Sequence, residues 1–234
     1  ALLAHLGSTD LVKVQSVYSH LCVAEDPAMD DFTRGQIRMF EENAARVEDA
    51  IGYHPILHIL NSAGIERFTW AQHDMVRLGV GIYGISALPD VKLKSVASLK
   101  VKILQVKELH PGDGAIGYGQ HGRIAPEGTR IATIPVGYAD GIDRRLGCGK
   151  VSFLLNGHRV PTIGNICMDM CMIDVTDLPQ VKSGDEVEIF GEHVLCADLA
   201  ERCDTIPYEL LCAVSKRVPR IYRLNGVPVD KNLH

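Results

Sequence analysis

Four segments of the sequence place a polar residue or a glycine at the end of an apolar run, where α/β sheets build their binding sites. They are residues 18–21 (Tyr-Ser-His-Leu), 58–63 (His-Ile-Leu-Asn-Ser-Ala), 75–84 (Met-Val-Arg-Leu-Gly-Val-Gly-Ile-Tyr-Gly) and 206–209 (Ile-Pro-Tyr-Glu). Their imidazole, guanidinium, hydroxyl and phenol groups can exchange protons or form hydrogen bonds with a ligand. Each also has a structural explanation, because such residues commonly act as satisfied core histidines, helix caps or partners of carboxylates.

Three further segments of this kind lie in the second half of the chain. They are residues 116–119 (Ile-Gly-Tyr-Gly), 134–141 (Ile-Pro-Val-Gly-Tyr-Ala-Asp-Gly) and 164–172 (Gly-Asn-Ile-Cys-Met-Asp-Met-Cys-Met). Cys167, Asp169 and Cys171 could suggest a metal site, but strand alternation would put all three on one face with no histidine nearby. We therefore expect core packing there and no metal. Residues 137–141 could form a plain turn, and Tyr118 could cover a hydrophobic edge.

The elements that position the first segments alternate between strand-like and helical patterns up to residue 84. Residues 12–21, 56–60 and 74–84 are expected to be strands, the last with a turn. Apolar residues spaced three and four apart from Ile37 to Ile51 predict an amphipathic helix that begins near Asp30 or Asp31. Asn61 and Ser62 stand where a helix would be capped. About three β/α units are visible where a closed barrel has eight, so this part cannot close a barrel alone.

The second part changes to short β-rich runs separated by turn signals such as His110-Pro-Gly-Asp-Gly and Asn156-Gly. Strands are expected over residues 99–106, 130–136, 151–155, 170–175 and 186–190, short helices over 197–203 and 208–214, and a final strand-like segment over 218–223. The fold class is therefore α/β plus all-β, with a barrel or sandwich as the second domain. We divide the chain into domains 1–92 and 93–234.

Taken together, in this order and at these separations, the seven segments resemble the alanine racemases. The resemblance covers the chain from about Val12 onward. The most specific stretches are residues 75–84, 135–141, 167–169 and 215–220, the last reading Ser-Lys-Arg-Val-Pro-Arg. The resemblance implies a (β/α)8 barrel of the TIM type followed by a β-rich C-terminal domain. Residues 1–92 would then be the C-terminal part of the cofactor-binding barrel, about strands 5–8.

The same resemblance implies the cofactor pyridoxal 5'-phosphate, the electron sink that amino-acid racemisation needs. Arg77 would face the pyridine nitrogen and, because guanidinium keeps its proton, would leave that nitrogen unprotonated. In fold-related decarboxylases an acidic residue takes this role, so the arginine favours a racemase. His20 and Asn61 would lie beside the ring. The phosphate ligands would be Ser62, Gly79, Val80 and Tyr208.

Racemisation also needs two opposed bases, and Tyr118 resembles the one that deprotonates L-alanine. The other is a lysine, so the catalytic group on this chain would be Tyr118, His20 and Arg77. A free phenol titrates near pH ~10, so Tyr118 would need nearby positive charge. Met168, through its backbone, and Tyr138 would contact substrate or line its entrance. In the family Tyr118 and Met168 act across a homodimer with shared active sites.

One part of the family pattern has no counterpart in this sequence. The cofactor lysine of alanine racemases lies in a Lys-Ala-(Asn/Asp)-Ala-Tyr-Gly-His-Gly segment, and no lysine here has that context. The chain is therefore expected to be a fragment that is inactive alone. Glu25, Asn165 and Lys216 also depart from the common pattern, in which Asp, Arg and an aromatic residue are usual. These departures concern the substrate channel and leave the reaction unchanged.

Charge and hydropathy exclude two kinds of partner. The formal net charge of -5, with no basic stripe, argues against nucleic acid. Apolar stretches are far shorter than the roughly 20 residues that span a bilayer. The resemblance to the alanine racemases implies a cytoplasmic enzyme that interconverts L- and D-alanine and supplies D-alanine to peptidoglycan. Two further functions stay open, namely a racemase of another amino acid such as serine, and a module that binds the cofactor without catalysis or is purely structural.

Overall fold

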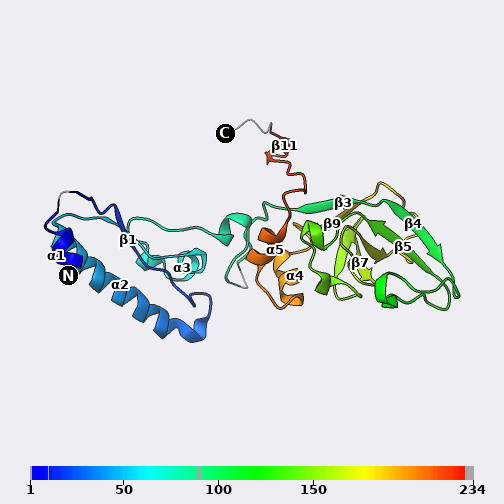
Figure 1. Cartoon of the computed structure of the whole chain (residues 1–234), viewed down its shortest axis with the longest axis horizontal. Helices are drawn as coiled ribbons and strands as arrows, with labels where there is room; N and C mark the ends of the chain where they lie inside the picture. Colours follow the sequence, from blue (N-terminus) through cyan, green and yellow to red (C-terminus); the bar gives the residue numbers. More distant parts are fainter. Residues whose placement is uncertain (1, 10, 89–90, 230–234) are drawn as a thin grey trace. The chain divides into compact units, whose positions relative to one another are not determined.

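The computed structural model describes residues 2–9, 11–88 and 91–229 of the chain. The chain divides into two compact units, Ala1–Val96 and Ala97–His234 (Figure 1), and each unit is described by itself. The domain boundary that we placed after residue 92 stays a prediction. Across the described ranges, no helix has the length and apolar character needed to cross a bilayer.

The first unit contains two parallel strands and the helices that follow them. Its elements are α1 (Leu2–Leu6), β1 (Ser16–Tyr18), η1 (Pro27–Met29), α2 (Asp30–Ile51), β2 (Ile56–His58), α3 (Ser62–Arg67), η2 (Thr69–Ala71) and η3 (Val80–Tyr83), where η denotes a 3-10 helix. In the parallel register Val17 lies opposite Leu57. This arrangement confirms an α/β architecture for the first part of the chain.

Helix α2 begins at Asp30, as the apolar spacing predicted, and ends at Ile51 before the C-cap Gly52. Ile37, Phe40 and Ala44 form its buried stripe. They belong to a core with residues from the other segments of the unit, which are Leu21, Ala24, Ile59, Leu60, Ala63, Phe68 and Ala71. Burial of each large side chain in such a core contributes roughly 1.5–3 kcal/mol. The core fixes the strand ends, where the candidate site residues lie.

The strand predicted over residues 74–84 is wrong. This segment contacts the end of β2 through single hydrogen bonds, from the Met75 amide to the Leu57 carbonyl and from the Arg77 amide to the Leu60 carbonyl. It then turns into η3 and ends at Gly84, whose φ is 82°. Three glycines in six residues weaken a strand, because glycine loses the most backbone entropy on ordering. The prediction for 12–21 was also too long, since β1 has only three residues.

The second unit is built on a seven-stranded antiparallel sheet with the order β3-β9-β6-β7-β8-β5-β4. Its strands are β3 (Leu99–Lys102), β4 (Gln105–Leu109), β5 (Thr129–Ile134), β6 (Ser152–Leu155), β7 (His158–Ile163), β8 (Cys171–Asp174) and β9 (Glu186–Phe190). The Ile103 amide donates a hydrogen bond to the backbone carbonyl of Asp185, next to β9. The Leu104 amide donates to the backbone carbonyl of Thr133 in β5. The chain therefore passes directly from one edge strand of the sheet, β3, to the other, β4, and the curled sheet forms a half-barrel.

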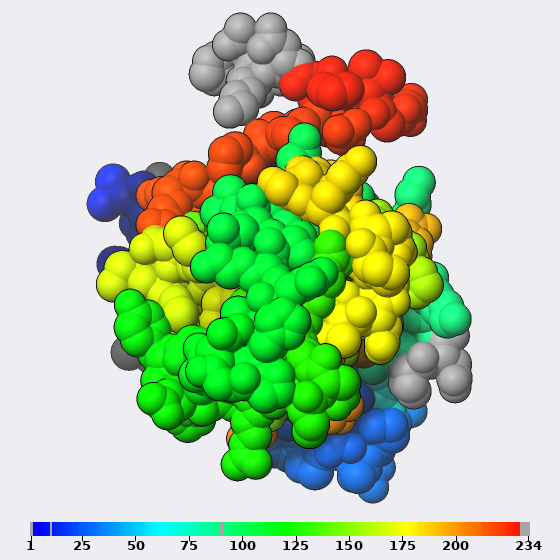
Figure 2. All heavy atoms as spheres, turned by 90° about the vertical axis from the view of Figure 1, so that its right-hand side faces the viewer, coloured from blue at the N-terminus to red at the C-terminus, as the bar shows by residue number. Residues whose placement is uncertain are grey.

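Shorter elements complete the second unit. They are η4 (Tyr118–Gln120), η5 (Tyr138–Asp140), η6 (Arg144–Leu146), α4 (Cys196–Arg202), α5 (Pro207–Ala213), β10 (Arg223–Leu224) and β11 (Val227–Pro228). Figure 2 shows the green part of the chain, which includes β4 and the residues that follow it, over much of one face. This part of the chain carries η4, and with it the candidate base Tyr118.

Most elements predicted for the second unit are confirmed, including β9 and the two short helices. The strand predicted over 99–106 is two strands, because Ile103 and Leu104 turn from one end of the sheet to the other. Strand β7 was not predicted, although the Asn156-Gly157 turn with both φ values positive is typical of a two-residue hairpin. The strand-like segment predicted over 218–223 is wrong, since pairing starts only at Arg223.

Candidate active site

Arg77 is held by backbone carbonyls at the ends of β1 and β2. Its Nη2 donates to the Ser19 carbonyl at 2.6 Å and to the Ile59 carbonyl at 3.2 Å. Its Nη1 donates to the His58 carbonyl at 3.1 Å. The guanidinium therefore joins the carboxyl ends of two parallel strands, the edge where α/β sheets place ligands. The sequence also allowed a carboxylate as the partner of Arg77, but these three hydrogen bonds all go to backbone carbonyls.

Two imidazoles also contact the Arg77 guanidinium. His58 Nδ1 lies 2.6 Å from Nη1, and His20 Nδ1 lies 3.3 Å from Nη2. Burial lowers the pKa of His58, and the charge of Arg77 lowers it further. His58 is buried, at 6% exposed, and its ring stacks on Tyr18 at 5.3 Å. His20 is exposed, so it does not act as a core histidine.

Ser62 and the segment after Arg77 bring several polar groups to one point. Ser62 is buried at the start of α3, and its Oγ accepts hydrogen bonds from the amides of Gly79 at 2.8 Å and Gly81 at 3.3 Å. A Cβ at Gly81 would lie 2.7 Å from Leu78 Cδ1, the end of a flexible and exposed side chain that can move aside. Val80 lies between these amides and starts η3. Converging amides of this kind suit an anion.

Asn61 caps helix α3, which is the structural role that its position in the sequence suggested. Its Oδ1 accepts from the Gly64 amide at 3.0 Å, and its Nδ2 donates to the Leu21 carbonyl at 3.1 Å. Both polar ends of the amide are thereby used to fix α3 against the loop after β1. Asn61 lies between His58 and Ser62 in the sequence, so it orders the segment that carries both.

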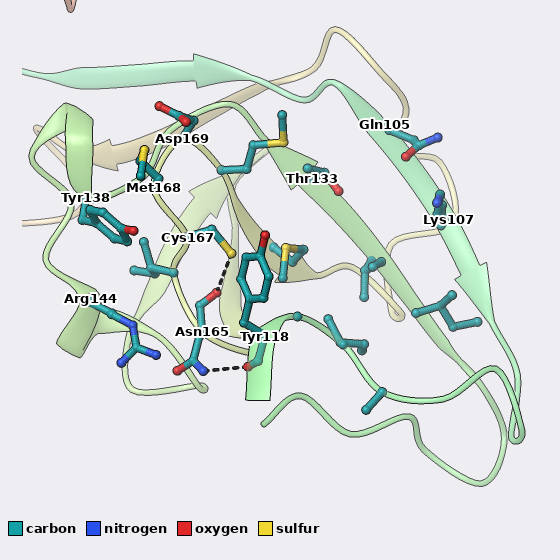
Figure 3. Close-up of a pocket in the computed structure, with 18 residues that line it drawn as sticks. Gln105, Lys107, Tyr118, Thr133, Tyr138, Arg144, Asn165, Cys167, Met168 and Asp169 are labelled. Carbon is teal, nitrogen blue, oxygen red and sulfur yellow. Dashed lines mark hydrogen bonds between the residues drawn. The ribbon is translucent and has the colours of Figure 1, made fainter. Parts of the chain in front are cut away.

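In the second unit a cleft of about 960 Å³ is lined by the candidate residues Tyr118, Tyr138 and Met168. Figure 3 shows the Tyr118 ring standing beside the Cys167 thiol, with Tyr138 and Arg144 also along the cleft. Tyr118 is 77% exposed, so its phenol is available to a molecule in the cleft. Sequence reasoning missed several lining residues on the sheet, which are Gln105, Lys107, Ile131, Thr133 and Met172. Alternation along β4 and β5 was the signal that could have found them.

The loops that carry Tyr138 and Met168 are joined backbone to backbone. The Tyr138 amide donates to the Cys167 carbonyl at 3.0 Å, and the Ala139 amide donates to the Met168 carbonyl at 2.9 Å. A Cβ at Gly137 would lie only 2.3 Å from the Cys167 carbonyl oxygen, so glycine is required for this approach. The plain-turn explanation for residues 137–141 is therefore incomplete, because the turn also fixes Met168.

Arg217 connects the same two loops through their carboxylates. Its Nε donates to Asp140 Oδ1 at 2.7 Å, and its Nη2 donates to Asp169 Oδ1 at 2.5 Å. Burial alone would raise the pKa of Asp140, but the hydrogen bonds from Arg217 and the Gly137 amide hold it below its usual value. The two carboxylates raise the pKa of Arg217. The sequence marked the segment of Arg217 as specific to the family but gave it no role. In the structure, Arg217 links the two loops at this end of the cleft.

Cys167, Asp169 and Cys171 do not come together as ligands. Burial raises the pKa of the Cys171 thiol to about 12, so this side chain stays protonated in the core. Asp169 is occupied by Arg217. Within the described ranges, no three side chains of the metal-binding types gather at one place.

Family models match both parts of the chain. Residues 96–222 match the C-terminal domain of alanine racemase, and residues 1–87 match its N-terminal domain. The chain belongs to the alanine racemase family. It is 38% identical over 222 residues to alanine racemase 1 of Clostridium acetobutylicum, covering 91% of this chain and 56% of that protein.

Solved alanine racemases agree with the fold. The enzyme of Clostridium difficile 630 matches with a TM-score of 0.87 and 31% identity, over 97% of this chain and 60% of that one. That of Bartonella henselae, described with covalently bound pyridoxal phosphate, matches with a TM-score of 0.80 and 30% identity, over 94% and 61%. The chain spans less than two thirds of the length of these alanine racemases.

The residues expected from the alanine racemases divide between the two units. The first holds Arg77, His20, Asn61, and Ser62 with the amide of Gly79, which the structure brings together at one strand edge. The second holds Tyr118, Tyr138 and Met168 along one cleft. Tyr208 also lies in the second unit, after the Pro207 that starts α5, and is 43% exposed.

Proposed function

We propose that this chain is the C-terminal portion of a pyridoxal 5'-phosphate-dependent alanine racemase, which interconverts L- and D-alanine in the cytoplasm and supplies D-alanine to peptidoglycan. The observation that carries the proposal is the setting of Arg77. A guanidinium fixed by three carbonyls at a strand edge can present a proton that it does not give up. In a chain of this family, that is the group expected to face a pyridine nitrogen. Residues 1–92 would be the cofactor part and 93–234 the β-rich part.

The first unit fits the phosphate of this cofactor. Amides of Gly79 and Gly81 already point at one buried oxygen, Ser62 Oγ, and a phosphate oxygen accepts the same kind of hydrogen bond. Tyr208 would add a phenol, and Val80 its backbone. No lysine is needed in this set. When bound, pyridoxal phosphate supplies the electron-accepting ring that makes the Cα proton of alanine removable.

Arg77 and His20 would control how much charge that ring accepts. Because Arg77 keeps its proton, the ring nitrogen that it faces stays unprotonated, which restrains side reactions such as transamination. The hydrogen bonds that hold the Arg77 guanidinium also fix its plane, and Asn61 orders the segment beside it. His20 would lie beside the ring.

Tyr118 would be the base that takes the Cα proton of L-alanine, with Met168 and Tyr138 contacting or admitting the substrate. Its exposed phenol would act in the site of a partner subunit, so the working protein would be a homodimer with shared active sites. Arg77 and His20 of that site would supply positive charge around the bound substrate. The opposite base would be a lysine that this sequence does not contain in the family context.

The test is chiral analysis of alanine and serine incubated with the full-length protein that contains this chain, with pyridoxal phosphate added. Racemisation of alanine in preference to serine supports the proposal. The 234-residue chain itself should show no racemisation and no stoichiometric covalent cofactor on any lysine after borohydride reduction. Preference for serine, or cofactor attached to one lysine of this chain, would contradict it.

A further inference from the structure

The loop that carries Tyr118 has an unfavourable backbone and is closed at its base. Ile116 and Gly122 exchange backbone hydrogen bonds of 2.9 and 3.1 Å, which leaves residues 117–121 as a short loop. Three residues in this loop have positive φ values, with 74° at Gly117, 70° at Gly119 and 55° at Gln120. The two glycines adopt these angles readily, but Gln120 does so at a cost. Some other group must hold the loop in this shape.

Asn165 is the side chain placed to hold it. Its Nδ2 donates to the Tyr118 carbonyl at 2.8 Å, and Figure 3 shows this bond directly below the Tyr118 ring. Asn165 is 7% exposed, so the bond is largely shielded from water. A Cβ at Gly119 would lie 3.6 Å from Asn165 Nδ2, so the amide packs against the glycine that follows Tyr118. One buried donor thus contacts the loop at the residue that bears the phenol.

Asn165 is itself fixed by its neighbours. Its preceding residue, Gly164, has φ of 68° and accepts from the Cys148 amide at 2.7 Å. A Cβ at Gly164 would lie 2.7 Å from the Ile116 carbonyl oxygen, so this backbone passes directly against the base of the Tyr118 loop. The Asn165 Oδ1 lies 3.6 Å from the Cys148 thiol. The carboxamide therefore has one orientation, with its donor toward Tyr118.

We infer that Asn165 is a positioning residue for Tyr118, which holds the tyrosine loop in the shape that presents the phenol to the cleft. The role rests on the proposed function only where it concerns catalysis. An aspartate at position 165 has the same shape but donates no hydrogen bond and brings a negative charge toward the Tyr118 carbonyl. The loop should therefore loosen while the sheet beneath it stays intact.

The test compares Asn165→Asp with Asn156→Asp in the complete chain. Both changes replace an amide by a carboxylate, but Asn156 lies in the β6–β7 turn and is exposed. Amide exchange measured by NMR should be roughly tenfold faster at Gln120 and Gly122 in Asn165→Asp, as expected for the loss of one hydrogen bond. A 3-fluorotyrosine signal at position 118 should shift in the same variant. Asn156→Asp should change neither measurement. If Asn165→Asp fails to fold, Asn165→Ser serves as the second variant.

Unchanged exchange and an unchanged fluorine signal in a folded Asn165 variant would overturn the inference. In the full-length holoenzyme, Asn165→Asp should also lower kcat for L-alanine with cofactor content unchanged. A loosened loop with unchanged kcat would leave Asn165 as the group that orders the loop and would instead contradict the role of Tyr118 as base. Failure of the inference and failure of the proposed function are thus distinguishable.

Discussion

Arg77 and His58 share a hydrogen bond of 2.6 Å between Nη1 and Nδ1. Because guanidinium does not release its proton at ordinary pH, His58 Nδ1 must be the acceptor. The proton of the neutral imidazole then lies on Nε2. A protonated His58 would place two donors and two positive charges against one another, so the geometry requires a neutral His58.

The first prediction concerns the pH dependence that follows from His58. Its pKa is lowered from 6.5 in the folded protein by burial and by Arg77. Below pH 6.5 the unfolded chain binds a proton at His58 more readily than the folded protein does. The free energy of unfolding should therefore fall as the pH drops. His58→Gln should remove this contribution. Urea unfolding at several pH values checks it, and an unchanged slope in His58→Gln would contradict the assignment.

The second prediction has the opposite sign and concerns His54. Its ring joins Glu48 Oε2 at 3.1 Å and Asp74 Oδ2 at 3.0 Å, and these hydrogen bonds raise its pKa above 6.5. The stabilisation is fully present below pH 6.5 and should be lost as pH rises through the higher pKa of the folded protein. An NMR titration of the His54 ring measures that pKa directly. A value at or below 6.5 would show that the carboxylates do not hold the proton.

The third prediction concerns the clamp around Arg217. Asp140→Ala should lower the free energy of unfolding by about 1–3 kcal/mol, because the Gly137 amide loses its buried acceptor. Asp169→Ala is the matched control. It should cost less, because the Asp169 side chain is 53% exposed and that of Asp140 only 12%. Equal losses in urea unfolding would mean that burial of Asp140 does not matter.

The sequence predicted the parts of the fold that depend on local spacing. Helix α2 followed from its apolar stripe, and the Asn61 cap from its place before a helix. Residues 74–84 were mistaken for a strand because they are rich in apolar residues. The segment does lie beside the end of β2, but its three glycines favour a turn, and it continues into η3. Strand β7 was missed because Pro161 and polar ends interrupt its alternation.

The sequence predicted which residues belong to the candidate site, but not most of the contacts that those residues make. Tyr118, Tyr138 and Met168 were named from short motifs, and the cleft brings them together. The partners of Arg77 could not be inferred, because backbone carbonyls carry no sequence signature. Asn165 was noted only as a departure from the family pattern, since its contact with the Tyr118 carbonyl joins residues 47 positions apart.

The fourth prediction concerns the shared site. A Tyr118→Ala protein mixed with a full-length protein that lacks the cofactor lysine should regain racemase activity after subunit exchange. Each heterodimer would then hold one intact site, with both lesions in the other. Mixed dimers isolated with two affinity tags supply the measurement, and Tyr118→Ala homodimers are the control. Confirmed exchange without recovered activity would show that Tyr118 does not act in a partner subunit.

In the proposed function, Tyr118 of this chain is the base that takes the Cα proton of L-alanine. The most direct measurement is the rate at which the full-length protein converts L-alanine to D-alanine, compared between the unchanged protein and Tyr118→Phe at equal cofactor content. Loss of a general base predicts a rate lower by about 10²–10⁴-fold in the L-to-D direction, with cofactor still bound. A Tyr118→Phe protein that racemises L-alanine at the unchanged rate would show that Tyr118 is not this base.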